Sequence, residues 1–323
     1  MDKSPLVCID FSFILYLLMP VKLCPGLDLK YSALPAIVNY NGQMVPSGRP
    51  LLDTSSIGFR YGEGIFETIK VLGGRIAMLD LHVERLFAGI RLLQFRLAAP
   101  LTIRNLEKQI LELCDENGCL TAARVRLVVF QGSPNGKEYA PLLADYVIES
   151  WPLDLSAMTD PYDGLAIDIF PAGKKSMDEF SNLKSNNYLI YSMAARWAYQ
   201  QGLDECLVLN AKERICDASI ANIFAIKGNE VFTPALTEGG IAGVMRKFIL
   251  AHIHKQEFRA EEIEMNVDWL QSVDEIFLTN ALRGIRPVRQ LGTKEFPTRR
   301  SRALSIWLNK FFEFPQPSVR SRV

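Results

Sequence analysis

The sequence predicts a mixed α/β protein of the α+β class, built from two domains. Segments with strand-like alternation and segments with helical periodicity occur in both halves of the chain, without the regular strand–helix repeat of a doubly wound sheet. Residues 153–164 are rich in Asp, Pro and Ser, which is typical of a linker, and 323 residues suffice for two compact domains. We therefore expect a smaller α/β domain over 36–152 and a larger domain over 165–323, each with a mixed sheet or barrel and flanking helices.

For the first half of the chain, the sequence predicts strands with two helices inserted between them. Asn41-Gly42 and Gly73-Gly74 supply residues that tolerate positive φ, so each pair predicts the turn of a hairpin. Asp80 is expected to cap the first helix, and Asn117-Gly118 to end the second. In order, two hairpins, two helices and two strands are expected over 37–46, 64–79, 80–95, 102–117, 123–132 and 145–153.

The second half opens with a predicted strand over 165–170, which a polar stretch over 171–187 follows. A further hairpin is expected to turn around Gly228-Asn229. The other expected elements are helices over 188–201, 243–255 and 297–312, strands over 205–210 and 275–280, and the hairpin arms within 222–234.

The overall composition excludes several classes of protein. Lys plus Arg and Asp plus Glu each number 36, so no strongly basic surface is predicted and no nucleic-acid partner is expected. Six cysteines in a chain of this length do not form a disulfide scaffold, and they fit the free thiols of a reducing compartment, so we expect a cytoplasmic protein. His252 and His254 lie two apart in a helical segment and face different directions, and we expect no metal site.

Residues 1–35 are expected to form a poorly ordered N-terminal extension. Asp10 and Pro20 interrupt its apolar run, which is short and broken for a membrane-spanning helix. The run also lacks the strong basic start and the small-residue cleavage site of a signal peptide. We expect no membrane partner, with a membrane anchor as the alternative interpretation.

Common catalytic motifs are absent from the sequence, including the phosphate loop, GxGxxG, HExxH and GxSxG. Several separated segments stand out instead. They are RYGEGIFETIKV (60–71), LHVERL (81–86), SNLKSNNYL (181–189), ICDASIANIF (215–224) with GGIAGVMRK (239–247), and EIFLTNALRGIRPV (275–288). In this order they resemble the fold-type IV pyridoxal-phosphate enzymes, the class IV aminotransferase family, which includes branched-chain and D-amino-acid aminotransferases and aminodeoxychorismate lyase. The resemblance covers about 37–312 and implies pyridoxal 5′-phosphate as cofactor and a homodimer with active sites near the subunit interface.

The resemblance implies that Lys184 is the catalytic lysine that holds the cofactor as a Schiff base. A lysine buried beside a cofactor has a lowered pKa, which lets it act as nucleophile and base. Taken alone, Lys184 would be interpreted as a surface lysine on a polar loop.

Three segments are implied to bind the cofactor phosphate. Arg85 matches the family arginine in LHVERL, and its planar guanidinium suits phosphate oxygens. Gly243-Val244-Met245 begins a predicted helix, where free N–H groups bind anions. The turn at Thr279-Asn280-Ala281 has alanine where many family aminotransferases carry threonine, so Asn280 or Thr279 is expected to supply that contact.

Two residues are implied to contact the cofactor ring. Asp217 aligns with the family glutamate that pairs with the pyridine nitrogen, and it is shorter by one methylene. Tyr188 matches a tyrosine that hydrogen-bonds the phenolic oxygen. The alternatives are an aspartate at a strand-end turn and a half-buried helix aromatic.

The substrate-binding residues are expected among charged positions near these motifs, with Gln131 replacing an arginine often found in the family. The candidates are Arg60, Tyr61, Glu67, Arg126, Lys137 and Arg283, with Arg286 as a further anchor. The preferred interpretation is an aminotransferase that moves an amino group between a small amino acid, such as a branched-chain one, and a 2-oxo acid. The alternatives are an aminodeoxychorismate lyase that releases 4-aminobenzoate and pyruvate, and an inactive relative that acts as a binding protein.

Overall fold

The computed structural model describes residues 35–133, 143–155 and 164–312. These residues form two sheets with helices against them, which confirms the predicted mixed α/β fold. The strands of the first half make one sheet and those of the second half make the other. The domain bounds themselves stay a prediction, and most of the predicted extension 1–35 and linker 153–164 lies outside the described residues.

The first sheet has the strand order β2-β1-β7-β6-β3-β4, with β5 paired to β7. All of its pairs are antiparallel except β5–β7. Its strands are β1 (Ile37–Tyr40), β2 (Gln43–Pro46), β3 (Gly64–Leu72), β4 (Arg75–Ile76), β5 (Arg96–Leu97), β6 (Ala122–Gln131) and β7 (Leu143–Pro152). The helices of this half are α2 (Ile57–Tyr61), α3 (Leu79–Leu92) and α4 (Ile103–Glu116).

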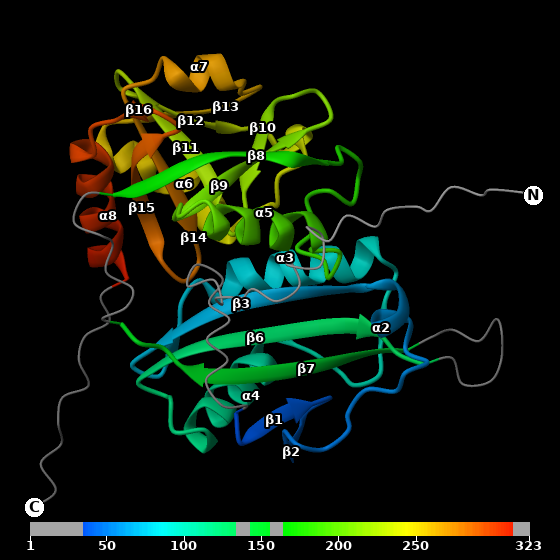
Figure 1. The fold of residues 1–323 in the computed structure, drawn as a ribbon. Coiled ribbons are helices and arrows are strands. Elements are labelled where there is room, and N and C mark those ends of the chain that lie inside the picture. Colours follow the sequence, from blue (N-terminus) through cyan, green and yellow to red (C-terminus); the bar gives the residue numbers. More distant parts are fainter. Residues whose placement is uncertain (1–34, 134–142, 156–163, 313–323) are drawn as a thin grey trace, which may run out of the picture.

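Alternation along the strands divides this sheet into two faces. One face packs against α3 and α4 through a core that includes Ile69, Leu86, Ile110 and Leu127. Residues of β3 and β6 on the other face point away from that core. Figure 1 shows α3 lying between the first sheet and the second half of the molecule.

The second sheet is mixed, with the order β10-β9-β8-β15-β14-β11-β12-β13 and β16 paired to β15. Its strands are β8 (Leu165–Lys175), β9 (Glu205–Asn210), β10 (Ile215–Ala218), β11 (Asn222–Lys227), β12 (Glu230–Pro234), β13 (Arg259–Ile263), β14 (Glu275–Asn280), β15 (Gly284–Leu291) and β16 (Lys294–Glu295). The helices are α5 (Leu189–Gln200), α6 (Val244–His252), α7 (Val267–Gln271) and α8 (Arg299–Phe311), with the short 3-10 turns η2 (Leu236–Glu238) and η3 (Ile253–Gln256). None of the helices in the described part of the chain is long and apolar enough to span a membrane.

The predicted turns are confirmed by the backbone. Asn41 and Gly42 have φ of 51° and 88°, and Gly73 and Gly74 have 54° and 70°. The prediction that Asp80 caps a helix was wrong, because α3 begins at Leu79 and Asp80 lies within its first turn. A carboxylate there still favours the helix N-terminus electrostatically.

Candidate active site

A cavity of about 440 Å³ lies between the two sheets. One wall consists of residues from β3 and β6 together with Arg85 of α3. The opposite wall consists of the segment around Lys184, the β10–β11 connection, the start of α6 and the turn between β14 and β15. All of the sequence segments that carry the family resemblance contribute residues, so the fold brings them to one place.

Lys184 lies on a segment that pairs with β3. The N–H of Phe66 donates to the Lys184 carbonyl at 2.8 Å, and the N–H of Asn186 donates to the Gly64 carbonyl at 2.8 Å. These bonds hold the lysine at the cavity wall, where its Nζ lies 4.4 Å from the Phe66 ring centroid. Burial, together with the nearby charge of Arg85, lowers the pKa of Lys184 to about 8. More of this amine is neutral near pH 7 than of an exposed lysine, as a nucleophile or base requires.

Asp217 is a buried carboxylate at the far side of the cavity, in β10. It accepts hydrogen bonds from Asn222 Nδ2 at 3.0 Å, the Ile241 N–H at 2.9 Å and the Tyr191 hydroxyl at 3.3 Å. Burial nevertheless raises the pKa of Asp217 to about 7. A cation bound in the cavity, such as a protonated pyridine nitrogen, would stabilise the charged carboxylate.

Arg85 is held in place by Glu67. Its Nε donates to Glu67 Oε1 at 2.7 Å, its Nη2 donates to Glu67 Oε2, and its Nη1 donates to the Ala242 carbonyl at 3.0 Å. A guanidinium has five N–H groups, so about two remain for another anion. Burial raises the pKa of Glu67, but the charge of Arg85 and the hydrogen bond with His82 outweigh it and lower the pKa to about 2. Glu67 is therefore ionised and orients the arginine.

The start of α6 offers backbone donors to the same region. Gly243 is the N-cap residue, and the N–H groups of the first turn have no partner within the helix. A helix N-terminus attracts anions for this reason and because of the helix dipole. Since Arg85 binds the carbonyl of Ala242, the residue before Gly243, its guanidinium lies close to these donors.

A hydroxyl group completes this region. Thr279 is buried and lines the cavity, and among the described residues its Oγ1 has no hydrogen-bond partner. It is paired in register with Asn222, the residue against which Gly243 packs. A buried hydroxyl without a partner is costly, so this group indicates a ligand with an acceptor oxygen.

Comparison with known proteins decides the family. The sequence pattern described as amino-transferase class IV matches residues 64–291. The chain belongs to the class IV aminotransferase family. It is thus an enzyme dependent on pyridoxal 5′-phosphate, the cofactor that members of this family use.

The relatives include enzymes with different activities. The aminodeoxychorismate lyase of Vibrio harveyi is 25% identical over 249 residues, which cover 76% of this chain and 88% of that protein. A putative branched-chain-amino-acid aminotransferase of Methanocaldococcus jannaschii is 26% identical over 260 residues, which cover 78% and 86%. The fold is similar to the crystal structure of a branched-chain aminotransferase from Thermoproteus uzoniensis, with a TM-score of 0.76 and 21% identity over 85% of this chain and 93% of that one.

The residues of the cavity fit pyridoxal 5′-phosphate. Lys184 offers an amine with a lowered pKa, and Asp217 offers a carboxyl group that would be ionised beside a protonated ring nitrogen. Arg85, the start of α6 and the Thr279 hydroxyl supply donors for a phosphate. The wall of one cavity thus carries an amine, a carboxyl group and phosphate donors of the kinds that the cofactor would need.

The structure places most of the predicted site residues together. Those that line the cavity are Arg85, Arg126, Lys184, Tyr188, Asp217, Gly243, Val244, Met245, Asn280 and Arg283. Two of these residues, Tyr188 and Asn280, form hydrogen bonds within the protein that differ from the expected contacts with the cofactor. The Tyr188 hydroxyl donates to the Ser219 carbonyl at 3.2 Å rather than being left for the cofactor, and the Asn280 side chain binds backbone groups of its own turn and of Ile220. Asn280 thus shapes the turn, which leaves Thr279 as the donor.

Four predicted substrate residues in the described part of the chain do not line the cavity, namely Arg60, Tyr61, Glu67 and Arg286. Glu67 is buried behind Arg85, with its carboxylate fully engaged. Arg60 and Tyr61 lie on the exposed helix α2, where Arg60 Nε donates to the Thr54 carbonyl at 2.8 Å. Lys137 lies outside the described residues.

Sequence reasoning missed several cavity residues. Arg124 lies two positions before Arg126 on β6, so strand alternation places both on one face and was a usable signal. Asn222 of the cavity wall and Tyr191 behind it both donate to Asp217, and neither had such a signal, because these contacts are made only after folding.

Proposed function

We propose that this enzyme is an aminotransferase that exchanges an amino group between a small amino acid and a 2-oxo acid, one of which carries a second carboxylate. The cationic face of β6 carries this proposal. Arg124 and Arg126 both line the cavity, and Arg126 lies over the Phe66 ring with its Cζ 4.8 Å from the centroid. Among the described residues, the buried Nε of Arg126 has no hydrogen-bond partner. A planar guanidinium held against an aromatic ring is suited to binding a carboxylate.

The size of the cavity supports a small substrate. About 440 Å³ must hold both cofactor and substrate, and ligand pockets span about 300–1,000 Å³. After the cofactor is bound, room remains for a compact amino acid rather than for a large one.

The chemistry divides between cofactor and protein. Pyridoxal 5′-phosphate supplies an electrophilic aldehyde and a ring that withdraws electrons from the substrate α-carbon. Lys184, with its pKa near 8, is suited to accept the proton from that carbon. Asp217 would keep the ring nitrogen protonated, and Arg85, which Glu67 orients, would bind the phosphate.

The second candidate function is aminodeoxychorismate lyase. It is favoured by Ala281 in the turn that follows β14, where many family aminotransferases carry threonine, and by the lyase relative from Vibrio harveyi. The substrate of a lyase also carries two carboxylates, so the arginines fit either reaction. The two reactions differ in what leaves the site.

Product analysis separates the two candidates. The purified enzyme is incubated with glutamate plus branched-chain 2-oxo acids, with D-amino acids plus 2-oxoglutarate, and separately with aminodeoxychorismate. We expect exchange of amino groups and no 4-aminobenzoate. Release of 4-aminobenzoate and pyruvate without amino exchange would reject the aminotransferase in favour of the lyase.

Arg126→Gln tests the binding of the second carboxylate. We expect its KM for a dicarboxylic substrate to rise about 10-fold or more, since a hydrogen bond to a charged group contributes about 1.5–3 kcal/mol. Its KM for a monocarboxylic substrate should change little. Arg91→Gln, on the exposed side of α3, serves as the control. An equal rise for both substrate types would contradict the assignment.

We also propose that the enzyme acts as a homodimer. The exposed apolar side chains of Phe180 and of Leu189 and Met193 on α5 line one hollow of the surface, which Gly62 also lines. Gly62 directly follows α2, whose Phe59 and Tyr61 are exposed as well. An exposed apolar patch of this kind is typical of a subunit interface. Arg60 and Tyr61 do not line the cavity of their own chain. A dimer formed through this patch would let them reach toward the cavity of the partner subunit.

Light scattering tests the subunit arrangement. We expect the mass of two chains for the wild type, and of one chain for Leu189→Arg combined with Met193→Glu. Ile306→Arg changes an exposed apolar residue of α8 and should leave the mass unchanged. A single-chain mass for the wild type would contradict the proposal.

A further inference from the structure

Lys175, the last residue of β8, connects two segments of the cofactor site without lining the cavity. Its Nζ donates to the Ser181 carbonyl at 2.7 Å and to the Gly239 carbonyl at 2.9 Å. Ser181 lies three residues before Lys184. Gly239 begins the loop that leads to α6, so one ammonium group binds the chain on both sides of the site.

The loop over 239–243 is in contact with the other cofactor residues. Gly239 has φ of 89°, and a side chain on it would collide with the Ser176 carbonyl. A side chain on Gly240 would collide with the Cys216 carbonyl, next to Asp217. The loop is therefore tightly packed between the end of β8 and β10, with no space for side chains at Gly239 and Gly240.

Hydrogen bonds from the loop extend to Asp217 and to the Lys184 segment. The Ile241 N–H donates to Asp217 Oδ2 at 2.9 Å. Asn182, two residues before Lys184, accepts from the Ala242 N–H at 3.1 Å and donates to the Gly240 carbonyl at 2.6 Å. A shift of this loop would move Lys184, Asp217 and the start of α6 together.

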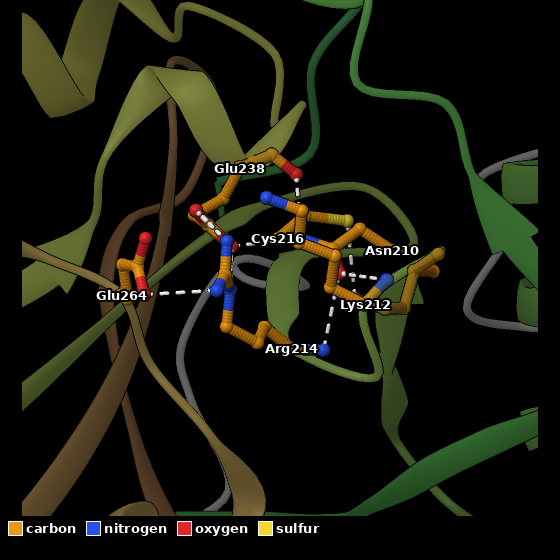
Figure 2. Close-up of polar contacts among 7 residues, drawn as sticks. Asn210, Lys212, Arg214, Cys216, Glu238 and Glu264 are labelled. Carbon is orange, nitrogen blue, oxygen red and sulfur yellow. Dashed lines mark hydrogen bonds and ion pairs between the residues drawn. The ribbon is translucent and has the colours of Figure 1, made fainter.

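The end of the loop away from α6 is anchored by a buried ion pair. Glu238 is buried and accepts from Nε and Nη2 of Arg214 and from Asn210 Nδ2 at 2.8 Å (Figure 2). Figure 2 also shows Glu264 on the other side of Arg214, where Nη1 donates to it at 2.8 Å. This anchor holds Glu238 to the β9–β10 turn, but none of its bonds within the described part of the chain reaches the Lys184 segment. That connection is made by Lys175 and Asn182.

Lys175 also brings charge to the site. The ammonium interacts electrostatically with Asp217 and lies 5.7 Å from the ring centroid of Tyr191, whose hydroxyl donates to the same carboxylate. Because Lys175 does not line the cavity, its charge acts on Asp217 from outside it. It is thus placed to favour the anionic carboxylate.

We propose that Lys175 is a positioning residue of the cofactor site, which ties the Lys184 segment to the loop before α6 and supplies positive charge near Asp217. The inference rests on the family's use of pyridoxal 5′-phosphate and not on the choice between aminotransferase and lyase. Loss of two charged hydrogen bonds is expected to weaken cofactor binding about ten-fold or more.

Titration of the cofactor-free, full-length chain with pyridoxal 5′-phosphate tests this, and no amino donor is needed. We expect about ten-fold weaker binding in Lys175→Met and near wild-type binding in Lys175→Arg, which keeps charge and donors. The control is Lys174→Met, the adjacent lysine on β8, which pairs with the exposed Glu213 and should bind as the wild type does. The absorption spectrum of the bound cofactor should also change in Lys175→Met, whereas a general loss of stability would leave it unaltered.

Wild-type affinity in Lys175→Met, or an equal loss in Lys174→Met, would overturn the proposal. If Lys175→Met does not fold, Lys175→Gln, which keeps a hydrogen-bond donor without the charge, is compared with Lys175→Arg. Equal affinity in these two variants would equally overturn it.

Discussion

At the scale of single residues, burial shifts the pKa values of Lys184 and Asp217, the two titratable groups of the proposed cofactor site, in opposite directions. It lowers the pKa of Lys184 to about 8 and raises that of Asp217 to about 7. In both groups burial favours the neutral form. The neutral amine of Lys184 would be able to attack the cofactor's aldehyde, and a protonated ring nitrogen would restore the negative charge of Asp217.

Asp217→Asn tests the role of the carboxylate. Asparagine keeps the size of the side chain but provides no negative charge for the ring nitrogen, so we expect kcat to fall about 100-fold or more. Asp217→Glu, which restores the charge, should recover much of the activity. Steady-state kinetics measure both, and an Asp217→Asn variant with more than a tenth of wild-type kcat would contradict this role.

Glu67→Gln tests the ion pair that orients Arg85. The folded-state pKa of Glu67, about 2, lies below its ordinary value of 4.5. The carboxylate therefore contributes stability that is complete above the ordinary value and is lost as the pH falls toward 2. At pH 7 we expect Glu67→Gln to lower the free energy of unfolding by about 3 kcal/mol.

Denaturant unfolding at several pH values measures this difference. It should shrink as the pH falls below the ordinary value of 4.5. Glu84→Gln is a matched control on α3, because Glu84 pairs with Lys247 and both are exposed. Exposed pairs contribute about 0–1 kcal/mol, so a loss in the control as large as in Glu67→Gln would refute the argument.

The sequence motifs were sufficient to predict that Lys184 and Arg85 lie in one site, and both line the cavity. The sequence was not sufficient to choose Thr279 over Asn280 as the candidate phosphate donor. That choice depends on which of the two side chains is left without a hydrogen-bond partner after folding. Asn280 binds its own turn, and the Thr279 hydroxyl has no partner among the described residues. Glu67 was misplaced for a related reason, since β3 alternation puts it on the face toward α3.

At the scale of elements, the start of α6 requires a glycine at position 243, because there is no space for a side chain. A side chain on Gly243 would collide with Asn222 Oδ1, and Asn222 is a donor to Asp217. The α6 N-terminus and the acid of the site are therefore packed against each other. A change at one is expected to disturb the other.

Gly243→Ala tests this packing. We expect the variant to lose about 2 kcal/mol of stability, a typical cost of inserting a methyl group into a filled space. Cofactor affinity should fall as well. Gly48→Ala, where nothing lies within 4 Å of the added carbon, is the control and should change stability by less than about 0.5 kcal/mol. Unchanged thermal unfolding and cofactor titration of Gly243→Ala would contradict the packing argument.

Elements with a clear pattern were predicted, and those shaped by tertiary pairing were not. The strand expected over 165–170 continues to Lys175, through residues whose polar sequence gave no strand signal. β13 was missed because it is largely exposed and polar and is held by backbone pairing with β12. β15 was missed because Pro287 and its arginines hide the alternation.

At the scale of the whole molecule, the site exists only because two sheets face each other. β3 and β6 of the first sheet supply one wall, and the second sheet with α6 supplies the other. The sequence predicted the fold class and the order of most of the elements. It did not predict the strand order, in which β8 lies between β9 and β15, because such long-range pairing leaves no local pattern.

The central claim is that Lys184 holds the cofactor, and reductive labelling tests it most directly. The holoenzyme is treated with sodium borohydride, which makes the lysine–cofactor bond permanent, and is then digested and mapped by mass spectrometry. We predict the pyridoxyl group on Lys184 and no label in Lys184→Ala. A label on another lysine, or no label in the wild type, would contradict the account.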